Sequence, residues 1–283
     1  MGKSETALEV ARVFNCEIVN GDAFQVYKEM DIGVAKPPKE YFSAVKHHLF
    51  SFVDIDQEYS IADYQKDLRK TIDEILSRGK NVVIVGGSGL YIRSGLYDYT
   101  FEEQEHLNMS KYEKFSNEEL HRELEKIDPK QAEIIHMNNR KRVLRAIEIY
   151  LSNGKTKSEI IDSQEHKLLY DAKFFVRDMD RKELYSLIDQ RVDKMMSKGL
   201  LDEVKSILSK YGESSKALQA IGYKEFIPVI KGECSLERGV ELVKKNSRNY
   251  AKRQVTFIKH QFPVVFYKNT KDLLEILRKW LII

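Results

Sequence analysis

The first residues of the sequence carry groups that can bind phosphate. Gly2, Lys3 and Ser4 are followed at once by residues 5–14, whose apolar positions recur at helical spacing. Backbone N–H groups at a helix start, together with one lysine, form a diphosphate site. The pattern matches the end of a phosphate-binding loop, G-x-x-x-x-G-K-S/T, without its first glycine and the strand before it. An ordinary helix N-terminus is the alternative, because G-K-S often occurs by chance.

A second set of residues with reactive side chains follows residues 16–20, which predict a strand. Asp22 and Gln25 come directly after this segment. In a doubly wound sheet the ligand crevice lies at the carboxyl ends of the strands, so we expect Asp22 near the phosphate loop. A carboxylate beside a diphosphate is unfavourable unless it binds a metal or accepts a proton from a nucleophile. The alternative is an aspartate that stabilises a turn or caps a helix.

The elements that would position these groups alternate between helix and strand. Residues 59–78 have helical periodicity, and 81–85 form a β-branched run that predicts a strand buried on both faces. A glycine-rich turn, 86–89, leads into the next helix. This order predicts an α/β fold with a parallel sheet and right-handed crossovers.

The segments between these elements give further expectations. Residues 30–37 are loop-like and carry a lysine, and His47 and His48 precede an apolar segment, 49–53, that predicts a strand. Adjacent histidines on a strand point in opposite directions, so we do not expect a shared metal site.

The second half of the sequence is mostly helical. Residues 102–164 are rich in charged and helix-forming residues without a strand pattern, which indicates a helical insertion. The remaining predictions are a helix ending near 153–154, a strand at 172–177, helical residues 181–211 with a break at Gly199, a helix at 236–261, a strand at 264–267 and a last helix.

Composition excludes several classes of protein. The 283 residues, 42% hydrophobic and 32% charged, are ordinary for a soluble protein with one large domain or two smaller ones. No apolar run is long enough for a membrane span, and no leader pattern is present. Cys16 and Cys234 are far apart in sequence and lack metal-ligand spacing. We therefore expect a reducing, cytoplasmic location.

Charge is unevenly distributed although the net charge is only +3. Residues 242–271 contain Lys and Arg but no Asp or Glu, and a second basic cluster lies at 140–145. Such clusters suggest a polyanionic partner, and solvated helix faces are the alternative.

Several segments occur in an order that is specific to one family: 2–4, 20–27, 30–37, 47–49, 85–91, 138–148, 221–225 and 250–254. Through them the sequence resembles the tRNA dimethylallyltransferases, also called tRNA isopentenyltransferases or IPP transferases, from residue 2 to about 266. The resemblance implies an α/β core of the P-loop NTPase-like type, formed by 1–101 and 165–283. It also implies a helical insertion domain, 102–164, that contacts tRNA.

The resemblance implies a prenyl transfer reaction. A dimethylallyl group moves from dimethylallyl diphosphate to N6 of the adenosine directly 3′ of the tRNA anticodon, giving N6-isopentenyladenosine. The implied partners are the tRNA anticodon stem-loop and the diphosphate, with Mg²⁺ as cofactor, no membrane and a monomeric protein. The target base must leave the anticodon-loop stack, which costs only a few kcal/mol in a single-stranded loop.

Matching positions to the family motifs implies roles for individual residues. The catalytic residues are Asp22 as general base, Ser4 and Arg191, and Ser4 also holds Mg²⁺. The diphosphate-binding residues are Gly2, Lys3, Ser4 and Arg191. The tRNA-binding residues are Asp22, Ala23, Phe24, Gln25, Ser88, Lys141, Arg142, Val143, Leu144, Arg145, Lys252 and Arg253. The alternative for Arg191 is a surface salt bridge with Asp189 or Asp193.

The sequence departs from the family at two places. The front of the phosphate loop and the strand before it are missing. The region 102–116 has fewer residues than we expect for the family's insertion. We expect the natural protein to have further residues before Met1 and around 102–116. No tRNA-contacting arginine is assigned in that region.

Three other functions remain as alternatives. A small-molecule isopentenyltransferase would act on free adenine nucleotides and would need no basic insertion helix. A metabolite kinase would need a Walker-type aspartate after a strand, whereas 82–85 runs into 86–88 without one. An RNA-binding protein without activity would leave Lys3, Asp22 and Arg191 without a role.

Overall fold

The computed structural model describes residues 2–101 and 107–281. They form two compact units, which we call the core unit (Met1–Leu96 with Asp171–Ile283) and the insertion unit (Tyr97–Tyr170). Glu102, at which the sequence predicts the insertion to begin, lies outside the described residues.

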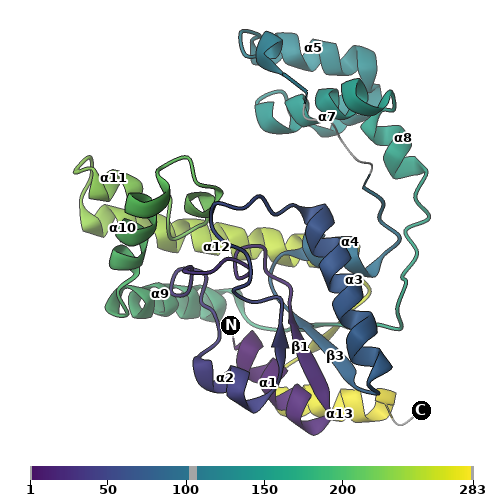
Figure 1. The fold of residues 1–283 in the computed structure, drawn as a ribbon, viewed down its shortest axis with the longest axis vertical. Coiled ribbons are helices and arrows are strands. Elements are labelled where there is room, and N and C mark those ends of the chain that lie inside the picture. Colours follow the sequence, from purple (N-terminus) through teal and green to yellow (C-terminus); the bar gives the residue numbers. More distant parts are fainter. Residues whose placement is uncertain (1, 102–106, 282–283) are drawn as a thin grey trace. The chain divides into compact units, whose positions relative to one another are not determined.

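The core unit is built from both ends of the chain (Figure 1). Its first part contains α1 (Lys3–Val13), β1 (Cys16–Asn20), α2 (Lys39–Ala44), β2 (His47–His48), α3 (Ile61–Ser77), β3 (Asn81–Val85) and α4 (Gly89–Leu96). Its second part contains β4 (Phe174–Arg177), α9 (Arg181–Ser197), α10 (Leu200–Tyr211), η2 (Lys216–Gln219), α11 (Ile227–Ile230), α12 (Leu236–Gln261), β5 (Val264–Tyr267) and α13 (Thr270–Leu281).

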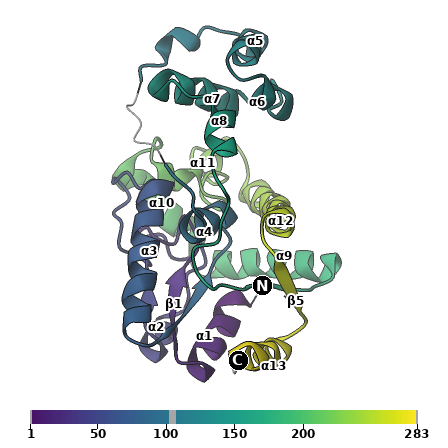
Figure 2. The ribbon, with the colours of Figure 1, turned by 90° about the vertical axis from the view of Figure 1, so that its right-hand side faces the viewer.

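A parallel sheet organises the first part. Its strand order is β2-β1-β3, and β1 pairs with β3 from Cys16 opposite Asn81 to Asn20 opposite Val85. Every residue of β1 is buried, and Figure 2 shows α1 and α3 on opposite sides of this strand. The strands at 16–20 and 81–85 and the parallel α/β arrangement are as the sequence predicts.

Two predictions about this sheet are wrong. The strand is at His47–His48 and not at 49–53, because Leu49 and Ser51 have φ of 61° and 50°, outside the range of extended backbone. Residues 82–85 of β3 are only partly buried, not buried on both faces. β3 lies at an edge of the described sheet, where fewer neighbours cover it.

The two helices beside β1 begin in different ways. α3 starts with a capping box, in which the Ser60 side chain accepts from the Asp63 amide and Asp63 reaches back to the Ser60 amide. α1 has no side-chain cap, and its N-cap Gly2 adopts φ of 77°. The first amides of α1 therefore remain open to an external acceptor.

The second part of the core unit packs a largely separate apolar cluster. Residues from α9, α10, α11 and α12 surround the segment after β1, with Val26, Met30, Tyr223 and Phe226 fully buried. Gly199, with φ of 93°, separates α9 from α10 as predicted. The predicted helix at 236–261 and strand at 264–267 have these bounds in the structure. β5 pairs with β4 in a small parallel sheet.

The insertion unit has its own core. It contains η1 (Ser110–Tyr112), α5 (Asn117–Ile127), α6 (Pro129–Ile134), α7 (Arg140–Asn153) and α8 (Lys157–Asp162). Leu120, Leu124, Val143 and Ile147 are fully buried in it. Across the described residues of both units, no helix is long and apolar enough to cross a bilayer.

Candidate active site

A cavity of about 650 Å³ lies in the core unit. It is bordered by the start of α1, the segments that follow β1 and β3, and the facing sides of α9 and α12. The lining residues used below are Gly2, Lys3, Ser4, Asp22, Phe24, Gln25, Lys36, Gly86, Gly87, Arg191, Lys224, Tyr250, Arg253 and Gln254. The position agrees with the expected crevice at the carboxyl ends of the parallel strands.

The start of α1 supplies positive potential to this cavity. Lys3 is the first residue of the helix, and it lines the cavity with Gly2 and Ser4. The surrounding protein lowers the pKa of Lys3, the positive charge of Arg191 lowers it further, and Asp22 raises it. Lys3 keeps an accessible surface inside the cavity, so water or a ligand still reaches it. The helix start and its lysine thus have the arrangement that binding of an anion requires, and the anion site itself stays a prediction of the G-K-S pattern.

Asp22 is held by a network centred on the buried Asn20. The Asn20 side chain accepts from the Asp22 amide at 2.9 Å and donates to the carbonyls of Asp22 and Leu49. The Tyr64 hydroxyl donates to the Asn20 carbonyl at 2.7 Å. Asp22 Oδ1 accepts from the Phe24 amide at 3.0 Å. This carboxylate therefore stabilises a turn, which the sequence analysis gave as the alternative to a catalytic role. Its side chain also lines the cavity, and the two roles are compatible because a carboxylate has two oxygens.

Arg191 lines the cavity from α9. The sequence analysis named Asp189 and Asp193 as its alternative partners. In the structure Asp189 accepts from Arg248 at 2.5 Å, and Asp193 pairs with Lys244 at 2.6 Å. Burial lowers the pKa of Arg191 and the charge of Asp22 raises it, so the two residues are electrostatically coupled. Guanidinium pKa values are so high that Arg191 remains a cation. One cavity thus holds Lys3, Asp22 and Arg191, which are far apart in sequence.

A loop of residues 31–36 forms another wall of the cavity and is held by a carboxylate that sequence analysis missed. Glu203 of α10 accepts from the amides of residues 31, 32 and 33 at 2.8 to 3.0 Å, and from the Tyr223 hydroxyl at 2.6 Å. Lys36 donates to Asp31 and to the Tyr27 carbonyl. Gln25 donates to the Val34 carbonyl at 2.9 Å, so its amide nitrogen supports the loop.

The glycine turn after β3 is clamped by α12. Gln254 donates to the Gly87 carbonyl at 2.7 Å, and a Cβ on Gly87 would lie 2.1 Å from the Gln254 amide nitrogen. A Cβ on Gly86 would lie 2.0 Å from the backbone of Gly21. Ser88 accepts from the Ala23 amide at 3.0 Å. Ser88 therefore connects this turn to the segment that carries Asp22, and it is not among the residues that line the cavity.

The basic stretches assigned to tRNA are divided between surface and interior. On α7, Lys141, Arg142 and Arg145 are exposed, whereas Val143 is fully buried and Leu144 packs against the same core. Only the charged side chains of this stretch face solvent. On α12, Lys252 and Arg253 are exposed, and Arg253 lines the cavity. Tyr250 lines it as well.

The residues that line the cavity fit a magnesium ion that binds together with a substrate diphosphate. Among the described residues no group of three or more His, Cys, Asp and Glu side chains could hold a metal. Mg²⁺ bound with a substrate diphosphate needs only one or two protein oxygens. The Ser4 hydroxyl and the Asp22 carboxylate supply oxygens in this cavity.

Sequence signals for the missed residues differ in strength. Tyr223 lies in the segment 221–225, which the sequence singled out without assigning a role, whereas Glu203 and Gln254 lie in ordinary helical patterns. Their contacts join α10 to residues 31–33 and α12 to Gly87, and no local pattern encodes such long-range pairings.

The parallel sheet with its flanking helices, the helix that begins at Lys3 and the glycine turn define an α/β protein with a P-loop NTPase-like fold. Residues 25–261 match the model of the IPP transferase family, and the chain belongs to that family.

Relatives agree with this assignment. A protein of Bacillus velezensis named tRNA dimethylallyltransferase is 46% identical over 270 residues, covering 93% of this chain and 86% of the relative. One of Staphylococcus haemolyticus with the same name is 41% identical, covering 98% of this chain and 86% of the relative. The family is therefore one of transferase enzymes.

Solved structures agree as well. The tRNA delta(2)-isopentenylpyrophosphate transferase of Staphylococcus epidermidis is similar with a TM-score of 0.73 and 40% identity, covering 99% of this chain and 94% of that chain. A eukaryotic dimethylallyltransferase acting on tRNA has a TM-score of 0.81 and 29% identity, covering 95% of this chain and 72% of that one.

Proposed function

We propose that this protein transfers a dimethylallyl group from dimethylallyl diphosphate to N6 of the adenosine directly 3′ of the tRNA anticodon. The observation that carries the proposal is the single cavity lined by Lys3, Asp22 and Arg191. Two cations and one carboxylate meet there, which suits a reaction with a diphosphate leaving group and a nucleophile that must lose a proton.

The cations act on the leaving group. When the allylic C–O bond breaks, its electron pair goes to the diphosphate, and negative charge grows on the bridging oxygen. Lys3, the amides at the start of α1 and the Arg191 guanidinium stabilise that charge. Mg²⁺ held by the Ser4 hydroxyl and the diphosphate oxygens would neutralise part of the same charge.

Asp22 acts on the acceptor. The adenine amino group is a weak nucleophile because its lone pair is delocalised into the ring. As the N6–C bond forms, the nitrogen gains positive charge, and one of its two protons passes to the Asp22 carboxylate. Phe24 and Gln25 line the cavity beside Asp22 and would contact the flipped base, with Ala23 and Ser88 supporting the same segment.

The exposed basic side chains would bind the anticodon stem-loop. Lys141, Arg142 and Arg145 of the insertion unit and Lys252 and Arg253 of the core unit supply sequence-independent affinity for phosphates. We propose that the monomer is active, and that it acts in the cytoplasm, where tRNA is modified.

The test measures transfer of radiolabelled dimethylallyl from its diphosphate to unmodified tRNA. Asp22→Asn is the informative variant, because asparagine can still accept from the Phe24 amide but cannot take the proton. We expect a loss of at least about a hundredfold in kcat, which is within the range for a general base. Binding of tRNA should persist. Asp54→Asn, a surface carboxylate paired with Lys28, is the matched control.

The outcomes separate the alternatives. Label on the adenosine 3′ of the anticodon, lost in Asp22→Asn alone, supports the proposal. Label on free AMP but not on tRNA would indicate a small-molecule prenyltransferase. ATP hydrolysis without any label transfer would indicate a kinase-like enzyme. Tight tRNA binding with no reaction would indicate an RNA-binding protein.

A further inference from the structure

One wall of the cavity is apolar and comes from two helices. Val192 and Met195 of α9 and Val243 of α12 line the cavity, and each of these side chains is at most 8% exposed. They belong to a single apolar cluster, against which Phe24 packs from the segment that carries Asp22. Apolar side chains therefore continue from the neighbourhood of the proposed base to the side of the cavity that α9 forms.

Two ion pairs join the helices that carry this wall. Asp189 of α9 accepts from Arg248 of α12 at 2.5 Å. One turn further along α9, Asp193 pairs with Lys244 at 2.6 Å. The helices therefore run antiparallel, and Val243 lies level with the turn of α9 that carries Asp193. Because none of the four charged residues lines the cavity, the separation of the two helices is fixed from outside it.

The spacing along α9 relates this wall to the cation of the proposed diphosphate site. Arg191 and Met195 are four positions apart, so they lie on the same face of the helix, about 6 Å apart along its axis. A hydrocarbon chain joined to a diphosphate at Arg191 is most stable where it leaves water for apolar surface. A dimethylallyl group, a four-carbon chain with one methyl branch, spans about one helical turn and would end at Met195.

We propose that Val192, Met195 and Val243 hold the prenyl chain of the donor, and that Met195 limits this chain to one isoprene unit. The inference rests on the proposed function, because it assumes a prenyl diphosphate whose phosphates lie at Lys3 and Arg191. A longer chain would meet the Met195 side chain, which is packed in the apolar cluster on its other sides. Side chains in an interior of this kind make room for additional methylenes only at a cost in free energy.

The experiment compares dimethylallyl diphosphate with geranyl diphosphate, whose chain is one isoprene unit longer. The first readout is the kcat/KM for geranyl transfer to tRNA divided by the kcat/KM for dimethylallyl transfer, measured on the same protein sample. This ratio does not depend on the folded fraction, so partial unfolding of a variant cannot imitate the effect. The second readout is the equilibrium affinity for each diphosphate in the absence of tRNA.

Met195→Ala should raise the ratio between about tenfold and a hundredfold. The substitution removes Cγ, Sδ and Cε where the longer chain would lie, and a single methylene can change discrimination by such a factor. Met195→Leu, which nearly keeps the volume, should leave the ratio close to the wild-type value. Met196→Ala is the matched control, because Met196 is the next residue of α9 and packs against the same cluster but does not line the cavity.

Three results would overturn the inference. Equal ratios in Met195→Ala and Met196→Ala would show that Met195 does not meet the prenyl chain. Equal use of both donors by wild type would show that no side chain limits the chain length. An unchanged ratio with a raised KM for tRNA in Met195→Ala would place the acceptor against this wall. Failure of the proposed function is a separate result, namely no label transfer by wild type, and the binding of the two diphosphates still reports on the Met195 contact in that case.

Discussion

At the scale of single residues, the site gathers charged groups from distant parts of the sequence around one cavity. Asp189 and Asp193 flank Arg191 in sequence, but Arg248 and Lys244 pair with them. Arg191 lines the cavity, where burial lowers its pKa and the charge of Asp22 raises it. A guanidinium can bind two oxygens of a diphosphate at once, which a lysine ammonium does not reproduce.

Arg191→Lys should therefore reduce activity although the charge is kept. We expect kcat/KM for dimethylallyl diphosphate to fall between about tenfold and a hundredfold, which corresponds to about 1.4 to 2.7 kcal/mol. Steady-state kinetics with the donor varied checks this. Arg181→Lys, on the same helix but outside the cavity, should keep wild-type values. Equal losses in both variants would mean that the guanidinium geometry at 191 is not specifically used.

At the scale of elements, close backbone approach shapes the site. β1 and the turn after β3 meet at Gly21 and Gly86, where the Gly21 amide donates to the Val85 carbonyl at 2.9 Å and the Ser88 amide donates to Gly21 at 3.1 Å. The contact leaves no room for a side chain at Gly86. At Gly87 the obstacle is only the flexible end of Gln254.

This contrast predicts different costs for two similar substitutions. Gly86→Ala should destabilise the protein by about 3 kcal/mol or more, because backbone atoms of Gly21 have to move. Gly87→Ala should cost about 1 kcal/mol, because Gln254 can rotate away at the expense of one hydrogen bond. Urea unfolding followed by circular dichroism measures both. Adding Gln254→Ala should relieve Gly87→Ala but not Gly86→Ala.

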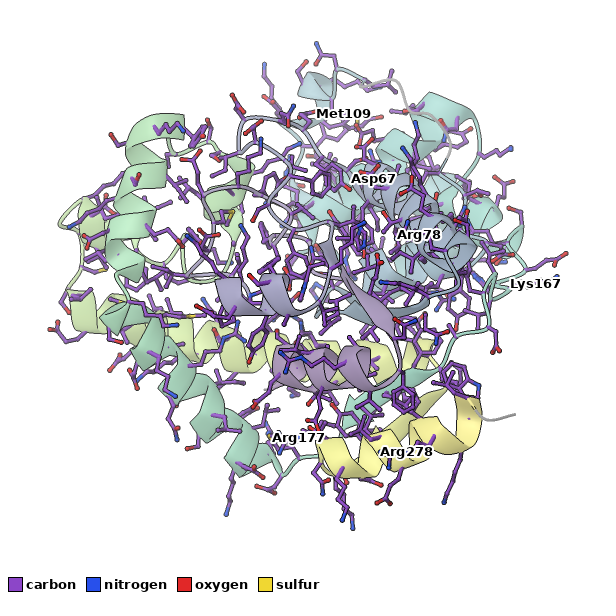
Figure 3. The ribbon with its side chains drawn as sticks, turned by 60° about the horizontal axis from the view of Figure 1, so that its bottom comes forward. Asp67, Arg78, Met109, Lys167, Arg177 and Arg278 are labelled. Atoms are coloured by element: carbon purple, nitrogen blue, oxygen red, sulfur yellow. The ribbon has the colours of Figure 1, made fainter. Side chains whose placement is uncertain are left out.

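A buried carboxylate ties β1 to its surroundings. Glu17 of β1 is 2% exposed and accepts from His48 of β2 at 2.6 Å and from Arg78, labelled in Figure 3, at 2.7 Å. Lys80 pairs with its other oxygen at 3.2 Å. Burial alone raises the pKa of Glu17, but bonds from His48 and Lys80 and the charge of Arg78 more than compensate and lower it to about 2.

The lowered pKa of Glu17 predicts a loss of stability in acid. A carboxyl whose folded pKa lies below the unfolded value of about 4.3 stabilises the fold above that value. This contribution, about 2 kcal/mol since solvent screens the partly exposed cations, should vanish as the pH falls from about 5 to about 2. Glu17→Gln should lack this part of the pH profile of the unfolding free energy. An unchanged acid slope in the variant would contradict the assignment.

At the scale of the whole molecule, the cavity and the basic surface of α7 belong to different units. The lining residues used above all belong to the core unit. The exposed lysine and arginine side chains of α7 belong to an insertion unit with its own apolar core. Substitutions on α7 should therefore affect the acceptor without affecting the donor.

The double variant Arg142→Gln with Arg145→Gln tests this division. We expect the KM for tRNA to rise at least about tenfold and the salt slope to fall by about 2, with the KM for dimethylallyl diphosphate unchanged. Arg122→Gln with Lys126→Gln, on α5 of the same unit, removes equal charge as the control. A matching loss in the control would mean that net charge, and not the α7 surface, sets the affinity.

The local part of the structure was predictable because its causes are local. The β-branched run at 81–85 and the helical periodicity of 236–261 predict where these two elements begin and end. The prediction of a strand at 49–53 failed because left-handed residues at Leu49 and Ser51 interrupt an apolar segment, and apolar content alone does not report φ. The partial burial of β3 also depends on which strands surround it.

From the amino-acid sequence we could predict the alternating elements, the phosphate-binding signature at Lys3 and, through ordered motifs, the family. These features depend on residue type and spacing over short distances. Folding brings Arg191 into one cavity with Asp22 and Lys3, places Glu203 against the amides of residues 31–33, and leaves Lys224 in the cavity lining without a partner among the described residues. The placements of Arg191 and Glu203 bring together residues more than a hundred positions apart, and they follow from packing α9, α10 and α12 against the segment after β1.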